Sequence, residues 1–287
     1  MKRRYSLSVS IVLYVCAIVL TTEAQQSPPA AAGARILLVP RRMISGERAT
    51  LAVLDVNGRL TPGVTIQFSN GDKVTTDSTG RALFVAPLTQ GALFASIAGR
   101  SGRVATAVLP AHSATDSPHV ELAPRIASVA DRFEIAGTGF CGDADKNEVN
   151  VAGQSALILA SSPDALVVLP PLDLAPGPAD VSVACGKQGS VQFKVLFVEL
   201  KLSADTSPLQ PGQKRTLRVT VAGTSERIQL EGRNLSPEIA DLTGGNVARI
   251  FSSGGEMNAA EFFVSGKKHG RFLISIRLVP TMAKLTP

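Results

Sequence analysis

The chain has 287 residues, of which 45% are hydrophobic and 18% charged, and its formal net charge is +6. This length suits two or three domains of ordinary size, and the hydrophobic content is enough to fill their cores. Eighteen prolines and 25 glycines, against 5% aromatic residues, are typical of a chain with many turns. These numbers exclude a fibrous protein, a polytopic membrane protein and a disordered tail.

The N-terminus has the pattern of a secretory signal peptide. Basic residues open the chain, an apolar run follows at residues 9–20, and a short polar segment ends at Ala24. This order predicts a signal peptide over residues 1–24, followed by a flexible leader at 25–33. The run of 12 residues is shorter than the roughly 20 needed to cross a bilayer. We therefore expect an extracytoplasmic protein (periplasm, cell surface or secreted) with no membrane span after cleavage.

Short β segments separated by turn residues follow from residue 34 onward. Residues 64–68 alternate between apolar and polar side chains, and Asn57-Gly58 and Asn70-Gly71 are hairpin-type turns. The strands expected in this first part lie at residues 50–55, 64–68, 81–85, 92–97 and 104–109. We expect an all-β domain at 34–110 and a linker at 111–118, because strands of this length and spacing favour a β-sandwich.

The rest of the chain continues in the same way. Expected strands of a second unit lie at residues 133–136, 147–151, 156–159, 165–169, 179–184 and 191–196. Those of a third unit lie at residues 216–221, 228–230, 259–264 and 271–278. The sequence thus predicts further sandwiches at 119–197 and 198–287, which makes three in tandem.

Only Cys141 and Cys185 remain after signal cleavage, because the third cysteine, Cys16, lies in the predicted signal peptide. Two cysteines in an exported protein predict one disulfide. The chain has no CxxC motif, and none of its three histidines lies beside either cysteine in sequence. We therefore expect a structural and not a reactive pair.

The middle unit resembles the IPT/TIG immunoglobulin-like domain. Matching segments occur in the order Gly137-Thr-Gly-Phe140, Asn147-Glu-Val-Asn-Val-Ala-Gly153, Leu166-Val-Val-Leu-Pro170, Pro176-Gly177 and Val181-Ser-Val-Ala184. The resemblance covers most of 119–197 and implies an Ig-like sandwich. In that topology the two cysteines lie at the same end of the sandwich, so they can meet. Closing this loop would then stabilise the unit by roughly 4 kcal/mol on the chain-entropy model.

The first unit is similar to bacterial Ig-like domains of surface proteins. The similarity rests on Pro62-Gly-Val-Thr-Ile-Gln-Phe68 and Thr76-Asp-Ser-Thr-Gly-Arg-Ala82. The third unit looks like a generic Ig-like module. These resemblances imply a binding or spacer role at the bacterial surface.

Loops at the ends of a rigid sandwich are where such folds place recognition. The loops beside the two cysteines are therefore candidate contact surfaces, with Gly142 and Lys146 on one side and Lys187 and Gln188 on the other. The basic strand edges of the third unit are a further candidate.

The segment from Asp143 to Asn147 opens like a calcium loop. Asp143, Asp145 and Asn147 have the D-x-D-x-N spacing of carboxylate and carbonyl ligands. The pattern then fails, because Glu148 stands where the turn needs glycine and Gln154 where a bidentate glutamate belongs. A short calcium site and a solvated acidic loop both remain open.

Catalytic signatures are absent from the sequence, including G-x-S-x-G, H-E-x-x-H and the P-loop. We therefore expect no enzyme and no cofactor. Basic pairs such as Arg41-Arg42 lack the interleaved aromatic residues of a nucleic-acid surface, so we expect no nucleic-acid partner. The mature chain would contain neither Trp nor Tyr, the residues on which bound sugars usually stack.

These features predict a non-enzymatic, exported, multi-domain Ig-like protein of the bacterial envelope or exterior. We expect it to act as a binding or spacer module whose partner is another envelope or extracellular protein. Two alternatives are an accessory module for polysaccharide binding beside an enzyme and a component of an outer-membrane or secretion assembly.

Overall fold

The computed structural model describes residues 36–111, 117–187, 189–205, 207–224, 226, 228–243, 248–251 and 259–285. Within these ranges the regular elements are β-strands and one short 3-10 turn, η2. The prediction of an all-β protein built from Ig-like sandwiches is confirmed. The predicted signal peptide, the leader and most of the linker lie outside the described residues.

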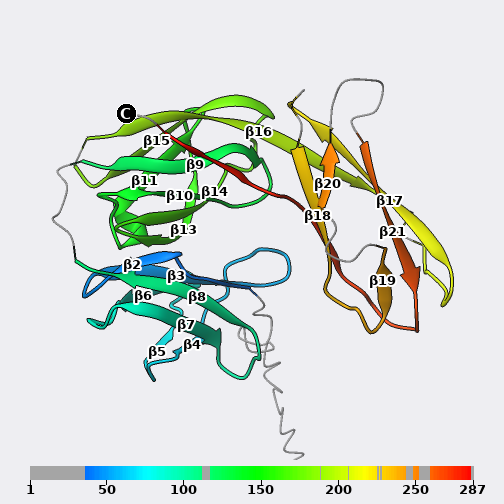
Figure 1. Ribbon diagram of the computed structural model, residues 1–287, viewed down its shortest axis with the longest axis horizontal. Coiled ribbons are helices and arrows are strands. Elements are labelled where there is room, and N and C mark those ends of the chain that lie inside the picture. Colours follow the sequence, from blue (N-terminus) through cyan, green and yellow to red (C-terminus); the bar gives the residue numbers. More distant parts are fainter. Residues whose placement is uncertain are drawn as a thin grey trace, which may run out of the picture.

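The first unit is a two-sheet sandwich at the bottom of Figure 1. One sheet has the order β2-β8-β7-β4-β5, and in the other β3 lies between β1 and β6. Between the sheets, Phe68 and Phe84 stack with their ring centroids 4.1 Å apart. The bounds are β1 (Ile36–Leu38), β2 (Arg42–Ile44), β3 (Arg48–Leu54), β4 (Thr65–Phe68), β5 (Lys73–Thr75), β6 (Arg81–Val85), β7 (Gly91–Ile97) and β8 (Arg103–Leu109).

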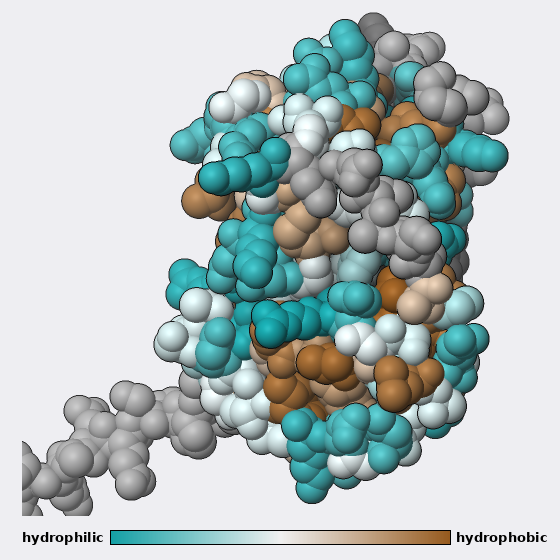
Figure 2. All heavy atoms as spheres, turned by 90° about the vertical axis from the view of Figure 1, so that its left-hand side faces the viewer, coloured by the Kyte–Doolittle hydropathy of each residue, from teal (hydrophilic) through white to brown (hydrophobic). Residues whose placement is uncertain are grey.

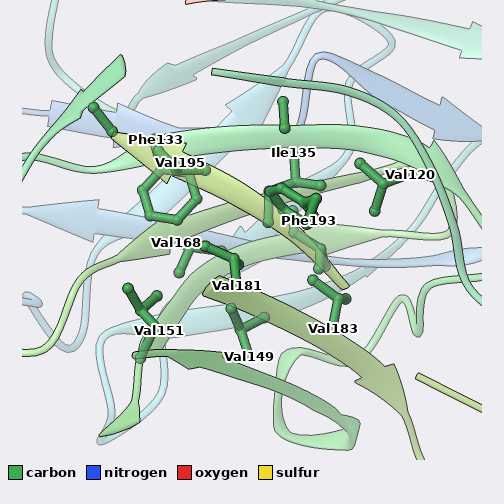
Figure 3. Packing of buried hydrophobic residues seen from close by; sticks show 14 of the residues in the cluster. Val120, Phe133, Ile135, Val149, Val151, Val168, Val181, Val183, Phe193 and Val195 are labelled. Atoms are coloured by element: carbon green, nitrogen blue, oxygen red, sulfur yellow. The ribbon is translucent and has the colours of Figure 1, made fainter. Parts of the chain in front are cut away.

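The middle unit has the largest core, which is rich in valine. Figure 3 shows valines from several strands turned toward Phe133 and Phe193. Every second residue of β15 from Ala179 to Cys185 is buried, as expected of a strand with one face on a core. The bounds are β9 (His119–Ser128), β10 (Phe133–Thr138), η2 (Ala144–Lys146), β11 (Asn147–Val151), β12 (Gln154–Ser155), β13 (Leu157–Ser162), β14 (Ala165–Leu169), β15 (Gly177–Cys185) and β16 (Val191–Ser203).

The third unit consists of two smaller sheets around a core that contains Phe262 and Leu230. One sheet joins the end of β16 to β17, β21 and β19, and the other has the order β20-β18-β22. The bounds are β17 (Lys214–Ala222), β18 (Ile228–Asn234), β19 (Ala240–Leu242), β20 (Ala248–Phe251), β21 (Ala259–Gly266) and β22 (Ile274–Leu278).

Two strands join the third unit to the middle one. β16 pairs with β15 over its first half and with β17 over residues 199–203, so a single strand belongs to both sandwiches. After β22 the chain leaves the third unit, and β23 (Thr281–Lys284) pairs antiparallel with β9 of the middle unit. In Figure 1 this red segment runs from the right-hand lobe back across the middle unit. The C-terminal segment therefore does not belong wholly to the predicted third sandwich, whose boundaries otherwise stay a prediction.

The first and middle units share a buried seam. β3 and β13 meet at the pair Thr50 and Ser161, where the two sheets become continuous. A separate buried cluster fills the space beside this pair and consists of Leu38, Ala52, Leu54, Leu159, Ala160 and Val167. Because aliphatic side chains from both units are buried together, separating the units would expose apolar surface to water.

Candidate functional site

The two cysteines form the predicted disulfide, with an S–S distance of 2.00 Å and Cα atoms 5.5 Å apart. Cys141 follows β10, and Cys185 ends β15. The bond ties the loop after β10 to the turn after β15, and the backbone N–H of Gly186 donates to the carbonyl of Lys146 at 2.8 Å. Both loops therefore lie at the same end of the middle sandwich.

Asn147 holds the Cys141 loop in shape. Its Oδ1 accepts the Cys141 N–H at 2.8 Å, and its Nδ2 donates to the Cys141 carbonyl at 2.7 Å. Nδ2 also donates to the carbonyl of Asp143 at 3.1 Å. These bonds pair the buried carboxamide of Asn147 and so stabilise the conformation of the Cys141 loop, because leaving such a group unpaired would cost free energy.

The residues that suggested calcium are engaged with other protein groups. The Asp143 carboxylate accepts the Asp145 N–H at 3.2 Å and caps η2. Asp145 lies 2.6 Å from Arg81 of the first unit. Of these contacts, the pair of Asp145 with Arg81 joins the loop of the middle unit to the first unit.

Thr50 is the central polar residue of the seam. Its Oγ1 donates to the Gly142 carbonyl at 2.9 Å and accepts the Ala144 N–H at 2.9 Å. Ser161 of β13 donates to the same Gly142 carbonyl at 2.8 Å. Gly142 is required here, because a Cβ at this position would lie 1.9 Å from the Arg48 carbonyl oxygen. Gly142 thus contacts the first unit, and its expected role in binding a partner stays a prediction.

Charged contacts surround the seam. The Arg81 guanidinium, whose side chain is 13% exposed, reaches Asp145 and also donates to the Ile158 carbonyl at 3.3 Å. On another side, Arg41 lies 2.8 Å from Glu134 of β10. Burial raises the pKa of the Glu134 carboxyl, although Arg41 and Arg42 act in the opposite direction. Glu134 is thus a largely buried carboxylate that pairs across the two units with Arg41, whose side chain is 79% exposed.

The structure describes two of the other three residues that were predicted to form contacts. Lys146 and Lys187 are exposed on the two loops joined by the disulfide, whereas Gln188 lies outside the described residues. A cleft of about 460 Å³ runs beside the disulfide between the two units, and its lining includes Lys146, Arg48 and Val85. Figure 2 views the molecule from this side of Figure 1 and shows hydrophobic side chains gathered over the lower, first-unit part of the face.

Within the ranges given above, no cluster of three or more His, Cys, Asp or Glu side chains is placed to hold a metal ion. Over the same ranges, no helix has the length and apolar character needed to cross a membrane.

Comparisons with known proteins do not assign a family. No family model matches the chain, and no curated protein is significantly similar to it. The resemblance of the middle unit to IPT/TIG domains therefore stays a prediction.

Several solved structures align with the chain at low identity. The surface layer protein SbsC, domains 1–6, aligns over 88% of this chain and 39% of its own, with 14% identity and a TM-score of 0.21. SGBP-B of a Bacteroides ovatus mixed-linkage glucan utilization locus, in complex with a mixed-linkage heptasaccharide, aligns over 86% and 74%, with 11% identity and a TM-score of 0.28. The Escherichia coli adhesin FdeC aligns over 91% and 99%, with 13% identity and a TM-score of 0.22. The chain spans about two-fifths of the SbsC structure, and with TM-scores this low the likenesses carry no functional argument.

Sequence reasoning missed the seam. Thr50 and Gly142 are 92 positions apart, and neither lies in a motif that signals a contact. The one available signal was Gly142 itself, beside a cysteine and without an evident turn requirement. A glycine in such a place can mark a close approach of another backbone.

Proposed function

We propose that this chain is a non-enzymatic, exported, multi-domain Ig-like protein that binds a partner, or separates partners, outside the bacterial cytoplasm. The disulfide between Cys141 and Cys185 carries the proposal, because disulfides persist in oxidising compartments and are rare in the cytosol. The signal-peptide pattern at residues 1–24 supports the same location independently. We place the middle unit in the IPT/TIG class and the first in the bacterial Ig-like class on their sequence motifs.

The architecture suits a rigid support. The buried cluster at the seam joins the first unit to the middle one. The continuous strand β16 joins the middle unit to the third. Rigid elements hold recognition surfaces in a fixed geometry, which limits the entropy lost when a partner binds. Lys146, Lys187 and the basic edges of the third unit are the surfaces that we assign to contacts.

The charged residues around the seam have structural roles, which supports a function without chemistry. Glu134 pairs with Arg41, and Asp145 pairs with Arg81, each pair joining two units. Arg277 of β22 lies 2.7 Å from Asp131 of the middle unit. These groups fix the relative placement of the units, and we assign none of them to a reaction.

Protein recovered from its native host tests export and pairing. N-terminal sequencing should begin at Gln25, and thiol titration of the unfolded protein should find no free thiol. Two free thiols, or an N-terminus that still includes the signal sequence, would contradict export into an oxidising compartment.

Crosslinking in living cells at native expression, followed by purification and mass spectrometry, tests the binding role. We expect one reproducible extracytoplasmic protein attached through Lys146, Lys187 or the third unit. Recovery of polysaccharide alone would instead favour the accessory role in polysaccharide binding, and a cytoplasmic partner would overturn the proposal.

A further inference from the structure

The third unit has an apolar groove between its two sheets. The groove encloses about 810 Å³, a volume within the usual range of binding sites. Leu200 and Leu202 of β16 line one wall, and Ile274 and Ile276 of β22 line the other. Leu235 and Leu273 extend the apolar surface, and Ile36 and Val56 of the first unit face it.

Along β16, the side chains on the core-facing side are more exposed toward the end of the strand that lines this groove. Val198 and Leu200 of β16 pack against the third core, and Leu202, two residues further along the same face, lines the groove. Val198 is fully buried, Leu200 is half-buried and Leu202 is 56% exposed. Ile274 and Ile276 on the opposite wall are also only half-buried. The inner faces of the two sheets are therefore open to solvent on one side.

Backbone groups at the groove also lack a strand partner among the described residues. At one end of the β18–β22 ladder the Leu235 N–H donates to the Leu273 carbonyl at 2.9 Å. At the other end the Val279 N–H donates to the Gln229 carbonyl at 2.8 Å. Odd-numbered residues of β22 therefore bond to β18. Alternation along an antiparallel ladder places the N–H and C=O groups of Ile274 and Ile276 on the other edge, away from β18.

The path of the C-terminal segment explains this open edge. A strand following β22 by a tight turn would lie along its free edge and cover the groove. Instead, β23 begins three residues after β22 ends and pairs with β9. The third unit thus has the apolar wall and the backbone donors of one further strand position, without a described strand in it.

We propose that this position accepts an extended segment of a partner protein, which adds to β22 as an extra strand. Strand addition supplies main-chain hydrogen bonds for affinity and side-chain pockets for specificity. A purely apolar small molecule would leave the edge amides and carbonyls of β22 unpaired, so a peptide suits this groove better. The proposal deepens the proposed function by naming the binding surface and the form of its partner.

Charge defines the partner further. Residues 198–287 contain 12 basic and 8 acidic residues, and Arg271, two residues before Leu273 of the groove wall, is exposed. We therefore infer a segment with alternating apolar residues and acidic flanks. A second copy would bring a third unit of the same positive charge, which disfavours it as the occupant.

Peptide binding to the full mature chain tests the proposal. The probe is a fluorescent ten-residue peptide with alternating valine and threonine, and with two glutamates at each end. Anisotropy should show saturable binding, weakened at least tenfold by Leu202→Asp or Leu235→Asp. Both leucines are more than half exposed, so neither variant should impair folding. Leu172→Asp is the matched control, at a leucine of the middle unit that is 96% exposed, and should bind as the wild type does.

Three results would overturn the inference. They are no binding of the acidic peptide, binding that both groove variants leave unchanged, and equal binding of the same peptide flanked by lysines. Self-association that Leu202→Asp abolishes would assign the groove to a second copy and would also overturn it. Photo-crosslinkers at positions 202 and 187 separate the two proposals: capture of an extracytoplasmic protein from 187 alone would retain the binding function and reject the groove.

Discussion

Gly142 and its neighbours determine how closely the first two units approach. The hydrogen of Gly142 faces the Arg48 carbonyl at a distance where a methyl group cannot fit. We predict that Gly142→Ala lowers the free energy of unfolding by about 3 kcal/mol, as expected of severe overpacking. Gly189→Ala is the control, because its Cβ would meet only Ser117, at 3.6 Å. Chemical denaturation measures both, and similar losses would argue against the seam.

A second prediction at the residue scale concerns Asp77, which caps the turn before β6. Its Oδ1 accepts the Thr79 hydroxyl at 2.6 Å and the Thr79 N–H at 2.8 Å. The bond from the Thr79 hydroxyl is the main cause that lowers the pKa of Asp77 from its usual 3.8. A carboxyl with a lowered pKa stabilises the fold above its usual value and loses this effect as the pH falls through the lowered one.

Asp77→Asn should therefore weaken the protein at neutral pH and reduce the loss of stability on acidification below about 3.8. Urea midpoints at neutral and acidic pH measure the difference. Asp173→Asn, at an exposed carboxylate of the middle unit, should keep the acid dependence of the wild type. An unchanged dependence in Asp77→Asn would refute the role of the turn.

Among the elements, β23 connects the C-terminal end of the third unit to the middle unit. It pairs with β9, and Leu285 just beyond it packs against the middle core and donates its N–H to Glu121 at 2.9 Å. We predict that Leu285→Asp destabilises the middle unit by about 2 kcal/mol, because a charge would replace a packed aliphatic group. Met282→Asp, at a side chain that is 41% exposed, should cost much less. Equal effects in thermal unfolding would indicate that β23 lies loosely on the sheet.

Individual strands and the disulfide could be predicted from sequence, because their signals are local. The alternation in residues 216–221 reappears as alternate burial along β17, and two remaining cysteines leave a single intramolecular pairing. The seam and the path of β23 could not be predicted in this way. Both depend on contacts between distant segments, such as Thr50 with Gly142 and Met282 with Pro124, and no periodicity encodes them.

For the whole molecule, the seam changes the expected response to loss of the disulfide. From sequence alone, Cys141→Ser should destabilise the middle unit much more than the others. The cluster of Leu38, Ala52, Leu54, Leu159, Ala160 and Val167 instead couples the first unit to the middle one. We now predict that both shift together in calorimetry, by up to about 4 kcal/mol, with a smaller effect on the third unit. An unchanged transition of the first unit would contradict this coupling.

The central claim is that a rigid disulfide-bonded support presents one open strand edge to a partner. Amide hydrogen exchange of the full mature chain, resolved by residue, tests it most directly. Ser275 and Arg277, paired with β18, should exchange slowly, whereas Ile274 and Ile276 should exchange fast until the acidic strand peptide is added and slowly afterwards. Slow exchange of Ile274 and Ile276 in the free chain would show that the edge is already covered and would contradict the account.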